Sequence, residues 1–302
     1  MKIISIIGTR PQVIKYSVLH DEIKKHKGIK EVIVDTGQHY DDNMNGNFYK
    51  EFRYKPDYWL GMKGEKDICK IEKVIKKEKP DKIIVIGDTN STYWGCLASG
   101  NVPLYHIEAG YRCFDNSLPE ERIRIAVDEL ADFNYTSTHR ASYNLVKENI
   151  YNYKYAGDLM YDLYLQNKRY IPYSREWNGR YILLTVHRKE NKNRINDILR
   201  YVVNKHKGHS IIFPVHPSVK DIITYEHDDL IMIDPVGYTK TLSLIHYAYK
   251  IITDSGGIIR ECYFMKKPVE ILRKSWEFQP ADNFGDGCAS EKIVAHLLTH
   301  IP

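Results

Sequence analysis

Short runs rich in isoleucine and valine alternate with longer stretches of helical period, and this alternation occurs in both halves of the chain. Runs of this length are typical of β-strands, whereas the stretches between them suit amphipathic helices. The pattern predicts parallel sheets covered by helices on both faces, because each crossover between parallel strands needs a helix-sized connection. The expected strands are residues 2–8, 31–36, 82–87 and 103–107 in the first half, and 180–186, 210–215, 230–234, 250–253 and 268–272 in the second.

The length of the chain sets the expected number of domains. Its 302 residues exceed what one hydrophobic core usually holds. We therefore expect two Rossmann-like, doubly wound α/β domains, over residues 1–160 and 161–302. The polar, tyrosine-rich stretch from Tyr161 to Gly179 shows no strand pattern and is the expected linker. Ligands of open α/β sheets bind beyond the carboxyl ends of the strands, so the loops after the strands are expected to form the site.

Composition excludes several classes of partner. A net charge of +5 suits an anionic substrate, but no basic stripe with interleaved aromatics indicates nucleic acid. The longest apolar runs are only strand-sized and no charged-then-apolar leader opens the chain, so we expect a cytoplasmic protein without membrane spans. The five cysteines are scattered without a C-x-x-C pair, which argues against a zinc site or a disulfide framework.

Two expected strand-to-helix turns have the chemistry of an anion site. Arg10 and Lys15 follow the first strand, and Pro11 is placed to begin a helix whose free amides favour an anion. Residues 254–257, Asp-Ser-Gly-Gly, follow a later strand and offer amides and a hydroxyl, as a diphosphate requires. A solvated basic turn and an ordinary capped turn are the alternatives. Neither a G-x-G-x-x-G nor a Walker A loop is present, so no dinucleotide or ATP site is expected.

Acids and histidines also follow the expected strands. Carboxylates that converge can have their pKa values pushed apart, which yields one acid and one base. The alternative is that each acid caps a turn or sits in the negative first turn of a helix. Histidines at such positions can titrate near neutral pH or donate to a phosphate. The acids are Asp88, Glu108, and Glu120 with Glu121, and the histidines are His39, His187 and His216.

Taken in order, these segments resemble the non-hydrolysing UDP-N-acetylglucosamine 2-epimerase family. The resemblance runs from residue 1 to about 273 and resumes at GDGCAS, residues 285–290. Its motifs are GTRPQVIK at 8–15, TGQHYDDNM at 36–44, GDTNST at 87–92, HIEAGYR at 106–112, PEERIR at 119–124, TVHRKEN at 185–191, PVHP at 214–217, IDPVGY at 233–238 and TDSGG at 253–257.

The resemblance implies a GT-B-type fold, a small-molecule UDP-sugar substrate held mainly through its UDP by the C-terminal domain, epimerisation at C2 and no nicotinamide cofactor or metal. Asp88, Glu108 and Glu120 would surround the sugar, and His187 would assist at the leaving diphosphate. Glu261 would bind the ribose and the backbone near Val236 the uracil. The full set of substrate-binding residues would be Arg10, Lys15, His39, Arg188, His216, Val236, Ser255, Gly256, Gly257 and Glu261.

The chain departs from the family pattern at several places. The segment from Leu60 to Glu72 lacks the usual Gln-Thr-Gly, so activation by a second substrate molecule is not expected. Ile123 replaces the usual asparagine of the PEExNR motif, and Phe278 replaces an arginine that could meet the substrate. A strand and a helix that normally precede Gly285 are absent. A C-terminal sheet shortened in this way risks an exposed edge, so we expect a homodimer contact or a rearranged edge there.

Three alternative functions stay open. The motifs GDTNST and RPQ, with the aromatic Phe278, also resemble relatives that epimerise UDP-2,3-diacetamido-2,3-dideoxyglucuronate. A hydrolysing relative would release free N-acetylmannosamine, although such relatives usually begin with a different first motif. A UDP-sugar-binding protein without turnover is the third alternative.

Overall fold

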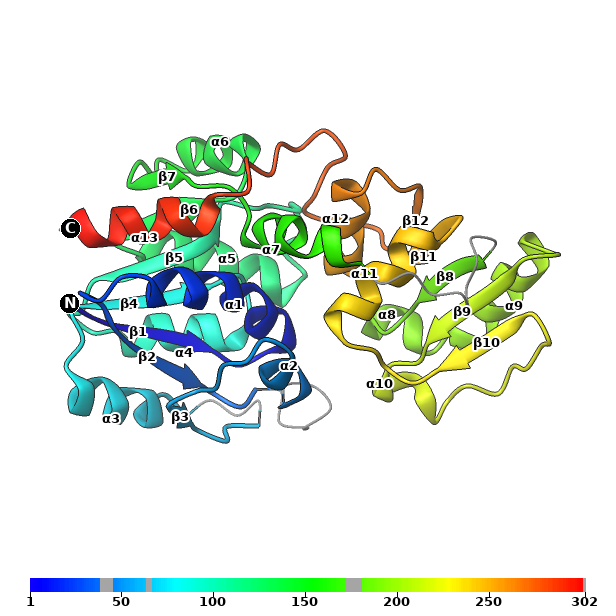
Figure 1. Ribbon diagram of the computed structural model, residues 1–302, viewed down its shortest axis with the longest axis horizontal. Helices are drawn as coiled ribbons and strands as arrows, with labels where there is room; N and C mark the ends of the chain where they lie inside the picture. Colours follow the sequence, from blue (N-terminus) through cyan, green and yellow to red (C-terminus); the bar gives the residue numbers. More distant parts are fainter. Residues whose placement is uncertain (39–45, 64–66, 172–180, 301–302) are drawn as a thin grey trace. The chain divides into compact units, whose positions relative to one another are not determined.

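The computed structural model describes residues 1–38, 46–63, 67–171 and 181–300. The chain divides into two compact units, one formed by Met1–Leu165 with Ala281–Pro302 and the other by Gln166–Pro280 (Figure 1). Each unit contains one sheet whose strands all pair in parallel. The parallel α/β class expected from the sequence is therefore confirmed.

The sheet of the first unit has the strand order β3-β2-β1-β4-β5-β6-β7. The order reverses between β1 and β4, and such a reversal is where ligands bind in doubly wound sheets. Residues of β1 and β4 are buried because helices cover both faces of the sheet. The strands are β1 Lys2–Ile7, β2 Lys30–Asp35, β3 Tyr58–Trp59, β4 Lys82–Ile86, β5 Leu104–Ala109, β6 Phe133–Thr136 and β7 Tyr153–Tyr155.

Helices α3, α4 and α5 pack in succession over one face of this sheet, and α1 lies beside the C-terminal helix α13 (Figure 1). Alternate residues of the strands, such as Ile4 and Ile6, form a buried core with α3, α4 and α5. The helices are α1 Arg10–Lys24, α2 Gly46–Glu51, α3 Ile68–Glu78, α4 Asn90–Ala98, α5 Pro119–Leu130, α6 His139–Lys147, α7 Leu159–Asn167 and α13 Ala289–Thr299.

Helix α13 corrects the expected division of the chain. The sequence placed all residues after 160 in the second domain, but the segment from Ala281 onward belongs to the first unit. Asp162 caps α13 by accepting hydrogen bonds from the amides of Ala289 and Ser290, at 3.1 and 2.8 Å. At the other end, the Lys82 ammonium group donates to the carbonyl oxygens of Leu297 and His300, which satisfies helix-terminal acceptors.

The second unit has a sheet of order β10-β9-β8-β11-β12, which reverses between β8 and β11. Buried residues of α9 pack against β8 and β9 on one face, and those of α11 and α12 pack on the other. The edge strand β12 spans only three residues, and short edge strands offer little template for unwanted pairing. The elements are η1 Lys168–Tyr170, β8 Tyr181–Thr185, α8 Lys189–Lys192, α9 Ile195–Lys205, β9 Ser210–Pro214, α10 Pro217–Lys220, β10 Leu230–Ile233, α11 Tyr238–Tyr247, β11 Lys250–Thr253, α12 Gly256–Phe264 and β12 Val269–Ile271.

The expected linker is partly a helix. Residues Leu159–Asn167 form α7, which buries Met160, Asp162 and Leu163. Asp158 begins this helix by accepting a hydrogen bond from the Met160 amide at 2.7 Å. The sequence showed only the polar and aromatic character of this stretch. Residues 172–180 lie outside the described part of the chain.

Candidate active site

The residues with candidate chemistry lie at the two points where strand order reverses. In the first unit, Gly8 follows β1, Asp88 follows β4 after one glycine, and Glu108 lies near the end of β5. In the second unit, His187 follows β8 and Asp254 follows β11. Each unit thus presents polar groups at the carboxyl edge of its sheet, where the amides of the following helices also point.

The turn from β1 into α1 is held by Gln12. Its side-chain oxygen accepts from the amides of Gly8 and Thr9, at 2.9 and 3.1 Å, and its amide group donates to the Ile86 carbonyl at 2.9 Å. A Cβ on Gly8 would lie 2.0 Å from the Thr36 hydroxyl, so only glycine fits there. Gln12 therefore ties the first turn to the end of β4, a structural role that the sequence indicates only through the Thr-x-x-Gln capping pattern.

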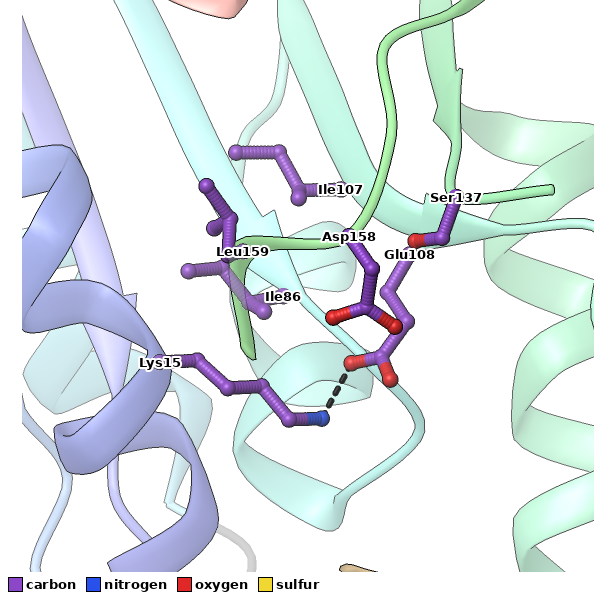
Figure 2. A pocket seen from close by; sticks show the side chains of 7 residues that line it. All are labelled: Lys15, Ile86, Ile107, Glu108, Ser137, Asp158 and Leu159. Atoms are coloured by element: carbon purple, nitrogen blue, oxygen red, sulfur yellow. Dashed lines mark hydrogen bonds and ion pairs between the residues drawn. The ribbon is translucent and has the colours of Figure 1, made fainter. Parts of the chain in front are cut away.

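Lys15 and Glu108 form an ion pair in a small recess at the carboxyl edge of the first sheet (Figure 2). Glu108 has a φ of 73°, a left-handed conformation that is uncommon for residues other than glycine. The pairing of β5 with β6 shifts register between Ile107 and Ala109, so Glu108 occupies a β-bulge. Bulges re-aim side chains near functional sites, and such strained backbone tends to occur where function requires it.

The recess has a second acid that the sequence did not indicate as a candidate. Asp158, only 2% exposed, lines it together with Lys15, Glu108 and Ser137 (Figure 2). Its carboxylate also accepts from the Tyr111 hydroxyl at 3.4 Å. The aspartate follows Gly157 after β7, at the same edge of the sheet, but β7 was not among the expected strands.

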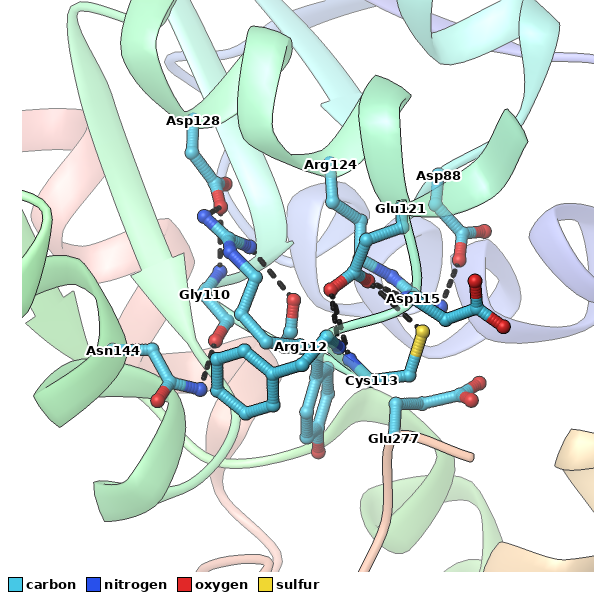
Figure 3. A network of polar contacts seen from close by, with 12 residues as sticks. Asp88, Gly110, Arg112, Cys113, Asp115, Glu121, Arg124, Asp128, Asn144 and Glu277 are labelled. Carbon is cyan, nitrogen blue, oxygen red and sulfur yellow. Dashed lines mark hydrogen bonds and ion pairs between the residues drawn. The ribbon is translucent and has the colours of Figure 1, made fainter. Parts of the chain in front are cut away.

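Asp88 is oriented by Arg124 of α5 (Figure 3). The guanidinium group donates through one nitrogen to Asp88 and through the other to Glu121, the latter at 2.7 Å. Glu121 is 1% exposed and also accepts from the amides of Cys113 and Phe114, at 3.0 and 2.8 Å. The guanidinium group thus links Asp88 to the buried Glu121, and its charge-assisted hydrogen bond orients the Asp88 carboxylate.

The two adjacent glutamates of α5 have different environments. Glu121 is buried in the network just described, whereas Glu120, in the first turn of α5, is half-buried. Burial raises the pKa of the Cys113 thiol, and the protonated thiol donates to Glu121 at 3.3 Å. Ile123 packs against the core under α5, and Arg124 supplies the polar contact to Asp88. Of the two glutamates, Glu120 is the one that is partly exposed to solvent.

The turn after β8 in the second unit is organised by Asp254, which is fully buried. Its carboxylate accepts from the amides of His187 and Arg188, at 3.1 and 2.9 Å, and from the Asn191 side chain at 3.0 Å. The Nδ1 atom of His187 lies 3.2 Å from the same carboxylate. A carboxylate at Nδ1 orients an imidazole ring and favours a proton on that nitrogen. From the sequence, Asp254 is expected only as part of the TDSGG motif or as the cap of an ordinary turn.

His216 and the start of α12 lie at the same edge of the second sheet. The His216 ring stacks on that of His187, with centroids 5.1 Å apart, and its Nδ1 accepts from the Ser218 amide at 3.2 Å. Ser255 is the residue before α12, and Gly256 and Gly257 form its first turn. A Cβ on Gly256 would lie 3.2 Å from a Glu277 carboxylate oxygen, so a side chain there would be crowded.

The remaining candidates occupy varied positions. Arg10 begins α1 with its guanidinium group over the Phe48 ring at 5.7 Å, and Arg188 precedes α8. Glu261 is buried within α12, whereas Val236 packs partly against the core beside α11. His39 lies outside the described residues. Phe278, which replaces the expected arginine, is 3% exposed and packs on the Arg260 guanidinium group at 4.8 Å.

No cluster of histidine, cysteine, aspartate and glutamate in the part of the chain that the structure describes has an arrangement able to hold a metal ion. Within the same residues, no helix is both long and apolar enough to span a membrane.

Sequence comparison connects this geometry with known proteins. The profile of the family described as UDP-N-acetylglucosamine 2-epimerase matches residues 21–283. A Methanococcus maripaludis protein named UDP-N-acetylglucosamine 2-epimerase homolog is 39% identical over 335 aligned residues, which cover 100% of this chain and 93% of the relative. A Pseudomonas aeruginosa UDP-2,3-diacetamido-2,3-dideoxy-D-glucuronate 2-epimerase is 36% identical, with coverage of 100% and 92%. The first alignment is longer than the chain of 302 residues, so that relative has residues that are absent here.

Solved structures agree with these sequence relatives. The Methanocaldococcus jannaschii UDP-GlcNAc 2-epimerase in complex with UDP-GlcNAc and UDP has a TM-score of 0.90 at 30% identity, covering 99% of this chain and 100% of that one. The Neisseria meningitidis enzyme bound to UDP-GlcNAc has a TM-score of 0.86 at 25% identity, with coverage of 99% and 100%. These likenesses confirm the expected Rossmann-like architecture of the GT-B type. The chain belongs to the UDP-N-acetylglucosamine 2-epimerase family.

Proposed function

We propose that this protein interconverts UDP-N-acetylglucosamine and UDP-N-acetylmannosamine by eliminating UDP and adding it back. The observation that carries this proposal is the ion pair of Lys15 with Glu108, which a strained bulge places at the ligand-binding edge of the first sheet. The Asp88–Arg124 pair lies at the end of the neighbouring strand β4. Carboxylates and a cation there suit a reaction in which charge and a proton move on a sugar.

The chemistry of the substrate explains the need for these groups. The C2 proton of the sugar is not acidic, because C2 carries an acetamido nitrogen and is not next to a carbonyl. If the bond from C1 to the UDP oxygen breaks first, its electrons leave with UDP and C1 becomes an oxocarbenium-like centre that anions stabilise. The C2 proton then transfers to a base, and a glucal with a C1–C2 double bond results.

The return step gives the epimer. A proton adds to C2 from the opposite face while the UDP oxygen bonds again to C1, so no net oxidation or water is needed. One carboxylate removes the proton and a second group supplies one. We assign these tasks to Asp88, Glu108 and Glu120. We propose that His187 and the start of α12 bind the leaving diphosphate. Arg10, Lys15, Arg188, His216, Val236, Ser255, Gly256, Gly257 and Glu261 are proposed as substrate contacts.

The direct test is proton NMR of the purified protein with UDP-N-acetylglucosamine in D2O, without added NAD. The expected result is the manno epimer with deuterium at C2, because the abstracted proton exchanges with solvent in the glucal state. Free N-acetylmannosamine with UDP would instead identify a hydrolysing enzyme. Binding without epimer or deuterium, for this substrate and for the diacetamido uronate, would reduce the protein to a UDP-sugar-binding protein.

A second candidate substrate is UDP-2,3-diacetamido-2,3-dideoxyglucuronate. The Pseudomonas aeruginosa relative that carries this name covers the whole chain at 36% identity, close to the identity of the first relative. The same NMR experiment with both substrates in one tube measures the ratio of the two kcat/KM values. If the ratio favours the uronate, the uronate becomes the proposed substrate in place of UDP-N-acetylglucosamine.

Substitution of the acids tests their assigned roles. Asp88→Asn and Glu120→Gln are each expected to lower kcat by at least about 10³-fold, because a general acid or base contributes on that order and neither amide transfers a proton. UDP affinity, measured by calorimetry, should stay within about twofold, since UDP is assigned to the second unit. Asp67→Asn is the matched control, because Asp67 is a partly exposed residue that precedes α3. Full turnover by either variant would remove that acid from the mechanism.

A further inference from the structure

His106 is a fully buried histidine whose two ring nitrogens both face hydrogen-bond acceptors. It lies in β5, two residues before Glu108. Its Nδ1 lies 2.7 Å from a carboxylate oxygen of Asp128, and its Nε2 lies 2.8 Å from the carbonyl oxygen of Gly87. A carbonyl oxygen cannot donate, and an ionised carboxylate cannot either, so both contacts are hydrogen bonds only if each ring nitrogen carries a proton.

The contacts of Asp128 show that its side chain is the acceptor. The second carboxylate oxygen accepts from the Gly110 amide at 3.0 Å and lies 2.7 Å from an Arg112 guanidinium nitrogen. Arg112 in turn reaches Glu148 at the end of α6. Within the described residues, the charged groups of this network are Asp128 from α5, Arg112 from the loop after β5 and Glu148 (Figure 3 shows the first two). Two donors, the Arg112 guanidinium group and the Gly110 amide, thus face one oxygen of Asp128, as donors do around an ionised carboxylate.

The network joins the two turns that hold the candidate acids. The Gly87 carbonyl group belongs to the residue before Asp88, and the Gly110 amide lies two residues after Glu108. Both glycines have positive φ values, 70° and 79°, so neither turn is set by ordinary backbone preference. A Cβ on Gly110 would meet the Ala141 carbonyl oxygen at 2.3 Å, which fixes that turn against α6.

We infer that His106 is a positioning residue with a proton on both ring nitrogens, which holds the Gly87–Asp88 turn and the Glu108–Gly110 bulge in one arrangement. The cation is buried beside Asp128, which balances its charge. Loss of either proton would break one of the two contacts and leave the turns joined only by the backbone hydrogen bond from the Gly87 amide to the Ile107 carbonyl at 2.9 Å. The catalytic part of this inference rests on the proposed function, but the protonation state does not.

The protonation state is tested by nitrogen-15 NMR of the wild-type protein labelled in histidine. The expected spectrum at neutral pH has one histidine with two protonated ring nitrogens whose signals disappear in His106→Gln. A His106 signal pair with one unprotonated nitrogen would overturn the inference. This result does not depend on substrate, so an inactive wild-type protein would refute the proposed function and leave the inference standing.

The positioning role is tested by kinetics of His106→Gln and His106→Asn, each of which keeps one of the two contacts. Displacement of catalytic groups by about 1 Å costs on the order of 10²-fold, and we expect kcat to fall by this factor with KM within about threefold. His20→Gln is the matched control, because His20 also pairs with a carboxylate. Its Nδ1 lies 2.6 Å from a Glu31 oxygen, away from the site. An unchanged kcat in both variants, with His20→Gln also unchanged, would overturn the positioning role.

Discussion

Arg124 shows how one side chain sets the geometry of the first unit at the scale of a single residue. It is buried and its two terminal nitrogens bind Asp88 and Glu121. Lysine keeps the charge of arginine but concentrates it in one ammonium group, which cannot span two carboxylates with the same fork. The orientation of Asp88 therefore depends on the shape of the guanidinium group as well as on its charge.

We predict that Arg124→Lys lowers kcat by roughly 10- to 100-fold, because a misaligned catalytic group costs up to about 10²-fold. The KM for the UDP-sugar should change much less. Arg122→Lys is the control, since Arg122 lies on the same helix but is exposed. Steady-state kinetics of the three proteins measures the effect, and equal kcat values would show that Asp88 does not need the fork.

The sequence predicts Asp88 and Glu108 as site residues from their places after strands and from their motifs, but it does not reveal their partners. Arg124 lies 36 residues from Asp88, and Lys15 lies 93 residues from Glu108. Such pairs form only when the strands are aligned, so no local pattern indicates them. The hydrogen bonds of Asp254 were likewise not indicated, because they reach the turn after β8, which is distant in sequence.

At the scale of secondary-structure elements, the strongly apolar strands were predicted well and the weak ones were not. Strands β1, β4 and β8 are buried on both faces and appear as mainly apolar runs. Strands β6 and β7, with the sequences Phe-Asn-Tyr-Thr and Tyr-Lys-Tyr, lack such a run because polar residues interrupt them. The amide group of Asn134, which is buried in β6, donates to the Asp128 carbonyl at 3.0 Å.

Helix ends provide a prediction about stability. Lys79 ends α3 with a φ of 48°, and it is exposed, so glycine there removes backbone strain without removing packing. Lys79→Gly should raise the free energy of unfolding by about 1 kcal/mol. Gly100→Ala is the converse substitution, because Gly100 has a φ of 58° and no atom lies within 4 Å of an added Cβ. It should lower the free energy of unfolding by about 1 kcal/mol. Urea unfolding measures both changes, and two shifts of the same sign would contradict the strain argument.

At the scale of the whole molecule, the last helix completes the first unit. His296 of α13 bonds the Tyr135 hydroxyl through Nδ1 at 2.9 Å, and its ring packs on Phe133 and His300 at centroid distances of 4.5 and 4.6 Å. Burial, with the nearby charges of His300, Lys154 and Lys82, lowers the pKa of His296 from 6.5 to about 4. The folded protein therefore holds this imidazole neutral.

This pKa sets a pH dependence for the docking of α13. Between pH 6.5 and 4 the unfolded chain binds a proton at His296 that the folded chain does not, so the stabilisation is complete above pH 6.5 and is lost as the pH falls toward 4. We predict that the Tm of the first unit falls over this range and falls less in His296→Gln. Scanning calorimetry measures the slopes, with the exposed His227→Gln as control. Parallel slopes for wild type and His296→Gln would contradict the linkage.

The homodimer and the cytoplasmic location expected from the sequence stay predictions. Sedimentation velocity of the purified protein distinguishes a monomer from a dimer. The short edge strand β12 means that the second sheet needs little additional cover at that edge.

The sequence by itself determined the parallel α/β class, most of the central strands and the family, because apolar runs and motifs are local and survive without knowledge of the fold. Only the tertiary structure decided that the segment from Ala281 onward joins the first unit and that Glu121 is buried while Glu120 is not. It also showed that His106 lies between two acceptors. These features depend on contacts between residues far apart in the chain, and the free energy of such contacts is set by burial and geometry that appear only when the sheet is assembled.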